Sequence, residues 1–169
     1  MLLIISTCAD KLSELEFVRP IERLVPVHKT VHCTKITPAD IATADKIIIA
    51  GTALKDFDYL KADFSWLRTT TRPVLGICAG MQVIATALGM PLEDFVTIGP
   101  RPVQVVKECA LISGAREAYF LHTKTACGFE TLAVTDGKPC MFKIPCKEMY
   151  GCIFHPEVLN ERIIARFAA

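Results

Sequence analysis

Short apolar runs alternate with amphipathic segments through the first half of the chain. Three of these runs, residues 2–5, 46–50 and 74–77, consist almost wholly of aliphatic residues, and residues 25–33 form a fourth, more mixed run. Short, continuous apolar runs are typical of strands that are buried on both faces of a parallel sheet. We therefore predict a strand at each of these four places.

The segments between these strands carry helical signals. Residues 13–24 have apolar side chains three apart, although Pro20 ends or kinks a helix there, and residues 56–67 carry aromatic and leucine side chains at helical spacing. A threonine–proline pair at 37–38 suits a helix start, and residues 79–88 are good helix formers. Strands that alternate with helices predict an α/β fold in which an open, mostly parallel sheet has helices on both faces, as in flavodoxin-like proteins.

The second half of the chain has a different sequence pattern, in which short strand-like runs are separated by turn residues. The sequence contains no internal repeat, low-complexity tract or linker. Because 169 residues suit one compact domain, we expect residues 1–169 to form a single α/β domain. We predict strands at residues 103–107, 118–121, 131–134, 140–144 and 150–154, and then a helix from residue 157 or 158 to residue 167.

Charge and hydropathy argue against two classes of partner. The 19 basic and 18 acidic side chains nearly cancel, so the chain lacks the basic surface that binds nucleic acid. Residues 73–92 carry no charge and are long enough to suggest a membrane span. Three glycines and a glutamine interrupt that stretch, which favours a buried strand, a tight turn and a buried helix. We therefore expect neither a nucleic-acid nor a membrane partner.

The cysteines and histidines outside the motifs below suggest packing rather than chemistry. The eight cysteines form no Cys-x-x-Cys pair and lie mostly in apolar stretches, where a free cysteine behaves as a small hydrophobe. The sequence shows no secretory signal, so we expect a reducing compartment, the cytoplasm. His28 and His32 share one face of a predicted strand but lie about 13 Å apart, too far to bind one metal ion.

The sharpest chemical signal lies in residues 76–80, whose sequence is GICAG. This pentapeptide follows an apolar strand and precedes a helix, which is the setting of a nucleophile elbow with cysteine in place of serine. The glycines allow the tight turn, and the N-terminus of the helix stabilises a Cys78 thiolate. The N–H of Ala79 then lies where an oxyanion would form. The pattern alone is weak, because a buried cysteine between two packing glycines would look the same.

A second motif, Phe154-His155-Pro156-Glu157, follows the last apolar strand. A thiolate nucleophile needs a base, and the base needs a carboxylate that fixes its tautomer and orientation. His155 and Glu157 are two residues apart across a proline, so both can lie near one strand end. We therefore predict a catalytic triad of Cys78, His155 and Glu157.

Together these motifs resemble those of class I glutamine amidotransferases. Residues 74–82 (VLGICAGMQ) are similar to the family's nucleophile signature, and residues 150–158 (YGCIFHPEV) are similar to its His/Glu signature. Residues 47–51 (IIIAG) match the strand and loop that supply the family's second oxyanion N–H, and residues 120–122 (FLH) match a strand that ends in a histidine. The motifs occur in the family's order and span nearly the whole chain.

The sequence departs from the family pattern around the triad. The usual Gly-Gly-Pro of the oxyanion loop is replaced by residues 51–53 (GTA), and the usual His-x-Asp by residues 122–124 (HTK). Residues 98–102 (IGPRP) lack the family's acidic, glycine-containing pocket sequence, and Ile153 stands where glutamine is usual. Because threonine has less backbone freedom than glycine, we expect the change at Thr52 to weaken the aim of the loop N–H.

The resemblance implies that the triad hydrolyses the side-chain amide of glutamine through a thioester on Cys78. It also implies oxyanion donors at Ala79 and at Gly51 or Thr52, and a role for Gln82 in shaping the elbow or the substrate site. No metal or organic cofactor is implied. Family members pass ammonia to a synthetase, and this chain has no P-loop, so the resemblance implies a separate ATP-dependent synthetase as partner. The short length and the His-Pro-Glu-Val sequence are most similar to stand-alone glutaminase subunits of the GMP synthetase type.

Two alternatives remain open at this point. The altered loop and pocket suit a regulatory module that keeps the fold and binds a partner without catalysis. The same triad also suits a cysteine hydrolase with another substrate, such as a peptidase or a γ-glutamyl hydrolase. A site that closes over a free amino acid near Arg101 and Lys124 would favour glutamine, whereas an open site would favour a longer substrate.

Overall fold

A computed structural model describes residues 1–114 and 116–169 of the chain. Its strands form one open sheet in the order β2-β1-β3-β4-β9-β8-β7-β5-β6. The strands are β1 (Leu2–Ser6), β2 (His28–His32), β3 (Lys46–Ile49), β4 (Val74–Ile77), β5 (Leu92–Val105), β6 (Arg116–Ala126), β7 (Glu130–Thr135), β8 (Lys138–Lys143) and β9 (Met149–Cys152). The α-helices are α1 (Glu14–Phe17), α2 (Arg19–Leu24), α3 (Pro38–Thr43), α4 (Ala79–Ala87) and α5 (Arg162–Ala168).

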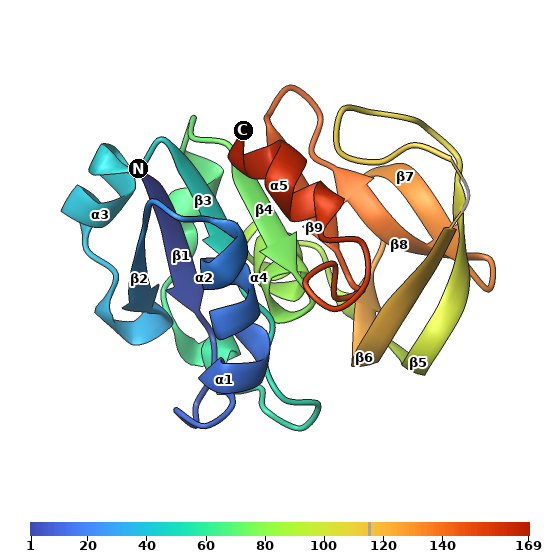
Figure 1. Cartoon of the computed structure of the whole chain (residues 1–169), viewed down its shortest axis with the longest axis horizontal. Coiled ribbons are helices and arrows are strands. Elements are labelled where there is room, and N and C mark those ends of the chain that lie inside the picture. The colour runs from blue at the N-terminus through green and yellow to red at the C-terminus, as the bar shows by residue number, and fades with distance from the viewer. Residues whose placement is uncertain (115) are drawn as a thin grey trace.

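The half of the sheet that runs from β2 to β9 is parallel, and the half from β9 to β6 is antiparallel. Figure 1 shows α1, α2 and α5 on one face of the parallel half and α4 on the other. The isoleucines of β1 and β3 are fully buried between these layers, as the aliphatic runs predict. The expected open α/β sheet with helices on both faces is therefore confirmed, and its parallel strands bring their carboxyl ends to one edge.

The structure corrects one predicted helix in the first half of the chain. Residues 56–67 form two short 3₁₀ turns, η2 (Asp58–Lys61) and η3 (Ser65–Arg68), and no α-helix. The Asp56 carboxylate accepts the N–H of Asp58, and the Asp63 carboxylate accepts the N–H of Ser65. Such local side-chain bonds compete with the α-helical ladder, which explains why helical spacing was misleading here. The predicted break at Pro20 is present, because α1 ends at Phe17 and α2 carries the proline in its first turn.

The antiparallel half differs most from prediction. β5 and β6 are 14 and 11 residues long and form a hairpin that extends well beyond the predicted strands at 103–107 and 118–121. β5 is mostly exposed or half-buried, and Gly99, Pro100 and Pro102 lie within it, so its composition suggested turns. The last helix begins at Arg162, after the predicted start at 157 or 158. Within the described residues, no helix is both long and apolar enough to cross a membrane.

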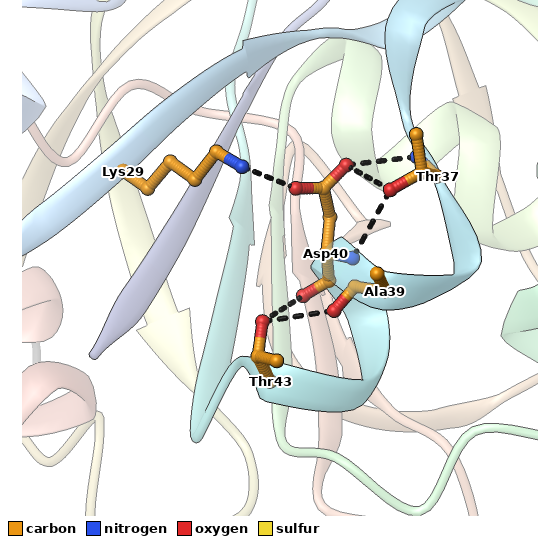
Figure 2. A network of polar contacts seen from close by, with 5 residues as sticks. All are labelled: Lys29, Thr37, Ala39, Asp40 and Thr43. Carbon is orange, nitrogen blue, oxygen red and sulfur yellow. Dashed lines mark hydrogen bonds and ion pairs between the residues drawn. The ribbon is translucent and has the colours of Figure 1, made fainter.

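Helix α3 begins with a network of polar contacts around Asp40 (Figure 2). The Asp40 carboxylate accepts the Thr37 N–H at 2.9 Å and pairs with the Lys29 ammonium group at 2.5 Å, and the Thr37 hydroxyl accepts the Asp40 N–H at 3.3 Å. This reciprocal capping box satisfies N–H groups that a helix start leaves without partners. The hydrogen bonds from Lys29 and Thr37 lower the pKa of Asp40 to about 2.

We predict that Asp40→Asn lowers the thermal unfolding midpoint at neutral pH. Because the folded-state pKa of Asp40 lies below its ordinary value of 3.8, its ionised form stabilises the fold above that value, and the contribution is lost as the pH falls toward about 2. The difference between the variant and the wild type should therefore shrink over that interval. Asp136→Asn serves as a control, since Asp136 is exposed and asparagine tolerates its positive φ of 47°. Equal loss in both variants, or a difference that persists at pH 2, would contradict this account.

Candidate active site

Cys78 lies at the turn between β4 and α4, at the carboxyl edge of the parallel strands. Its backbone has φ 50° and ψ −101°, a conformation that costs a non-glycine residue about 1–3 kcal/mol. Two backbone hydrogen bonds hold it there: the Cys78 N–H donates to the Cys152 carbonyl at 2.8 Å, and the Cys78 carbonyl accepts the Gln82 N–H at 3.1 Å. The predicted strand–turn–helix geometry is thus present, with the thiol only 3.6 Å from the Leu121 carbonyl of β6.

The glycines of the GICAG motif are required by close approach rather than by backbone dihedrals. A Cβ on Gly80 would lie 2.2 Å from the Ile49 carbonyl oxygen, and one on Gly76 would lie 2.5 Å from the backbone of Gly80. Real Cβ atoms do not approach backbone atoms so closely, and backbone cannot swing away as a side-chain end can. The first turn of α4 therefore packs directly on the ends of β3 and β4, which sets the position of Cys78.

His155 and Glu157 form a buried pair just beyond β9. The His155 Nδ1 lies 2.7 Å from the Glu157 Oε1, and the two side chains are 1% and 0% exposed. The backbone fixes the pair, because the His155 N–H donates to the Tyr119 carbonyl of β6 at 2.8 Å. The Phe17 ring of α1 covers the imidazole with its centroid 5.5 Å away.

Opposing effects act on the His155 proton. Burial lowers the pKa of His155, but the neighbouring Cys78 and Glu157 outweigh burial and hold that pKa well above its ordinary value of 6.5. Cys78 and Glu157 both lie close to the buried imidazole and favour its charged form. The site is therefore suited to a protonated histidine at neutral pH.

Gly51, at the end of β3, lies against both reacting side chains. A Cβ on Gly51 would be 2.8 Å from the His155 Cε1 and 3.4 Å from the Cys78 Cβ. Neither Gly51 nor Thr52 has a positive φ, so threonine at 52 strains no dihedral. The expected conflict between Thr52 and the loop backbone is thus absent, and Gly51 is needed for space rather than for conformation.

Gln82 is buried under the cysteine, and its amide is already bonded at both ends. The Tyr59 hydroxyl donates to the Gln82 Oε1, and the Gln82 Nε2 donates to the Lys124 carbonyl at 3.0 Å. This side chain ties α4 to both the η2 turn and β6. In this structure Gln82 therefore shapes the wall of the site.

His122, at which the sequence resemblance ends the strand of residues 120–122, lies beside Cys78. Its ring is 2% exposed, stacks near Phe95 and Phe120 at centroid distances of 5.7 and 5.8 Å, and borders the same cavity as Cys78. Burial lowers the pKa of His122 to about 4, so the ring is neutral at physiological pH. Among the described residues, neither of its nitrogens has a well-formed hydrogen bond. A neutral ring avoids a second positive charge beside His155.

The cavity beside Cys78 is small. The volume in which a water molecule fits is only about 10 Å³, which is room for about one water. The loop after β3 and η2 form one wall, and residues 121–123 of β6 form the other. Arg101 and Lys124, which were expected near the substrate, do not line it: Lys124 pairs with Asp94 at 2.6 Å on the hairpin surface. A glutamine side chain needs the walls to separate.

Comparisons with known proteins agree on one family. The model of class-I glutamine amidotransferases matches residues 20–163, more than four fifths of the chain. A glutamine-hydrolysing GMP synthase subunit from Methanothrix thermoacetophila is 29% identical over 134 residues, which cover 73% of each chain. The GMP synthase of Phenylobacterium zucineum is 35% identical over 101 residues, or 52% of this chain, but this chain spans only 19% of that protein.

Solved structures show the same fold. A Thermoplasma acidophilum protein, described as a candidate GMP synthase subunit, matches with a TM-score of 0.82 at 21% identity, over 99% of this chain and 92% of that one. A glutamine amidotransferase from Thermotoga maritima matches with a TM-score of 0.71 at 16% identity, over 96% and 78%. Because the family match covers most of its length, the chain belongs to the class I glutamine amidotransferase family.

Proposed function

We propose that residues 1–169 act as a glutaminase domain that hydrolyses the side-chain amide of glutamine. The observation that carries this proposal is the buried His155–Glu157 pair beside Cys78, with the cysteine at the N-terminus of α4. A nucleophile, a base and an orienting carboxylate in this order are the components of covalent amide hydrolysis. Membership of the amidotransferase family supports glutamine as the amide.

The chemistry follows from the protonation states at the site. The Cys78 thiolate attacks the amide carbon, and the carbonyl oxygen becomes an oxyanion. The His155 imidazolium gives its proton to the amide nitrogen, so the C–N bond breaks, ammonia leaves and a glutamyl thioester stays on Cys78. Neutral His155 then takes a proton from water, the resulting hydroxide attacks the thioester, and glutamate leaves as the C–S bond breaks. Glu157 orients the imidazole and stabilises its charged form throughout.

We assign the oxyanion to two backbone donors. Ala79 begins α4, and N–H groups in the first turn of a helix have no intrahelical acceptor. The second donor comes from the loop after β3, at Gly51 or Thr52, which lies beside Cys78. Gln82 holds the start of α4 in place through its hydrogen bonds to Tyr59 and Lys124. The proposed chemistry needs no metal or organic cofactor.

We further propose that the ammonia is delivered to a separate ATP-dependent synthetase, of the GMP synthetase kind. The match to the Methanothrix GMP synthase subunit, of which this chain covers 73%, supports a stand-alone glutaminase. The small size of the cavity supports control by a partner, because a glutamine side chain fits there only when a wall moves. The same small cavity also favours one alternative, a regulatory module that keeps the fold without turnover, and the experiments below separate the two.

Cys78 is predicted to be the most reactive of the eight cysteines despite its burial. Cys78 is 5% exposed, whereas Cys146 is exposed, so accessibility alone would favour Cys146. Cys78 lies at the start of α4 beside a histidine, which is the setting in which reactive cysteines occur. Brief treatment with iodoacetamide at neutral pH followed by peptide mapping measures this. Labelling of Cys146 ahead of Cys78 would count heavily against a catalytic elbow.

Variants of the three triad residues should differ in how much glutaminase activity they lose. We expect Cys78→Ala and His155→Ala to abolish glutamate release, and Glu157→Gln to leave a small residual rate, because an orienting carboxylate costs less than the nucleophile or base. Glu157→Gln also removes one of the charges that raise the pKa of His155. Its residual rate should therefore fall more steeply than that of the wild type as the pH rises through neutrality. Wild-type turnover in Cys78→Ala would reject the mechanism.

The isolated chain is predicted to be a poor glutaminase that a synthetase activates by about a hundredfold, the scale of one well-placed catalytic donor. The physical reason is the small cavity, which a partner enlarges if it binds the enlarged state more tightly. Glutamate release is measured with and without the purified synthetase from the same organism, with Cys78→Ala as the control. High turnover alone, unchanged by any synthetase, would reject coupling. No turnover at all, with Cys78 still alkylated, would favour the regulatory module or another substrate.

A further inference from the structure

The segment that follows β1 contacts the backbone of the proposed oxyanion loop. The Thr7 hydroxyl lies 3.0 Å from the Ala50 carbonyl and 3.1 Å from the Gly51 carbonyl, and the Cys8 thiol lies 3.6 Å from the same Gly51 oxygen. Thr7 is 1% exposed, so water does not compete for these bonds. The single Thr7 hydroxyl proton is shared between the two carbonyls, and together with the Cys8 thiol it directs the Gly51 carbonyl toward residues 7 and 8.

This contact determines which way the next N–H points. In a trans peptide the carbonyl of one residue and the N–H of the next are antiparallel. Since the Gly51 carbonyl points to Thr7, the Thr52 N–H points away from it. Gly51 itself lies against Cys78 and His155, and the structure shows no acceptor for the Thr52 N–H among the residues it describes.

A second connection ties the same loop to the same segment. The Thr52 hydroxyl donates to the Asp56 carboxylate at 2.7 Å, and the Ala9 N–H donates to that same oxygen at 2.7 Å. The side chain that replaces the family's glycine thus anchors the loop. The peptide between Gly51 and Thr52 is held on both sides, by Thr7 through its carbonyl and by Asp56 through the threonine side chain.

We propose that Thr7 is a positioning residue that aims the Thr52 N–H at the oxyanion, with Asp56 as a secondary anchor. The proposal rests on the glutaminase function above. Thr7 touches neither the substrate nor the reacting atoms, and it acts only through the Gly51–Thr52 peptide. Without its hydroxyl the peptide loses its main constraint, and the oxyanion loses a preorganised donor in the transition state.

The test compares Thr7→Val, which removes the hydroxyl at nearly constant shape, with Thr7→Ser, which keeps it. Thr135→Val is the matched control, because Thr135 is equally buried and donates to the Pro102 carbonyl at 3.0 Å, in the antiparallel half of the sheet. We expect Thr7→Val to lower kcat for glutamine about tenfold to a hundredfold with KM changed less than about threefold. Thr7→Ser should recover most of the rate, and Thr135→Val should leave kcat unchanged.

Alkylation of Cys78 by iodoacetamide separates positioning from general damage, because this substitution at carbon forms no oxyanion. Its rate should be the same in Thr7→Val and wild type. Unchanged kcat in Thr7→Val, or a parallel loss of alkylation, would overturn the proposal. If Thr7→Val does not fold, as judged by circular dichroism, Asp56→Asn provides the test, with a smaller loss of kcat and unchanged alkylation expected.

Failure of the glutaminase function is distinguishable from failure of this inference. If the wild type releases no glutamate under any condition, the same variants are compared on p-nitrophenyl acetate, whose hydrolysis at Cys78 also passes through an oxyanion. The rate of Cys78→Ala is subtracted as background. A tenfold loss in Thr7→Val on this ester supports positioning without glutamine. A wild type with no activity on either substrate, or an unchanged ester rate in Thr7→Val, overturns it.

Discussion

The close packing of the α4 N-terminus on the ends of β3 and β4 is the constraint on which the site depends. The helix approaches so closely that Gly80 has no room for a Cβ beside the Ile49 carbonyl. That approach forces the chain to turn within one residue, and Cys78 adopts the strained conformation that results. The hydrogen bond from the Cys78 N–H to Cys152 in β9 then joins the turn to the strand that His155 follows. One packing contact thus places the proposed nucleophile and its proposed base at the same edge.

The strained backbone of Cys78 and the buried polar groups lower the stability of the fold, and packing elsewhere offsets this loss. The His155–Glu157 pair is fully buried, the Glu157 Oε2 has no partner among the described residues, and His122 is desolvated beside them. Each feature opposes folding by an amount on the order of 1–3 kcal/mol. The strands beneath them are fully buried aliphatic runs, and each such side chain contributes about 1.5–3 kcal/mol. Core packing of the parallel half therefore keeps the reactive groups in conformations that they would not adopt alone.

The parallel half and the elbow could be predicted from the sequence because both follow from local rules. Aliphatic runs identify strands buried on both faces, and glycines around Cys78 identify the tight turn. The β5–β6 hairpin could not be predicted in the same way, because its strands are half exposed and contain Gly99 and two prolines. The partners of Gln82 were also beyond prediction, since Tyr59 and Lys124 lie 23 and 42 residues away in the chain. Contacts at such separation depend on the topology of the sheet, which no local pattern contains.

The two walls of the cavity come from different halves of the sheet. The loop after β3 is tied to residues 7–9 by the Thr7 hydroxyl and the Asp56 carboxylate, and it belongs to the rigid parallel half. The opposite wall belongs to β6, which meets the catalytic turn through the Gln82–Lys124 and His155–Tyr119 bonds. A preorganised donor accelerates a reaction only if it does not move when charge develops. The loop after β3, which we propose as the oxyanion loop, therefore lies next to the fully buried strands of the parallel half.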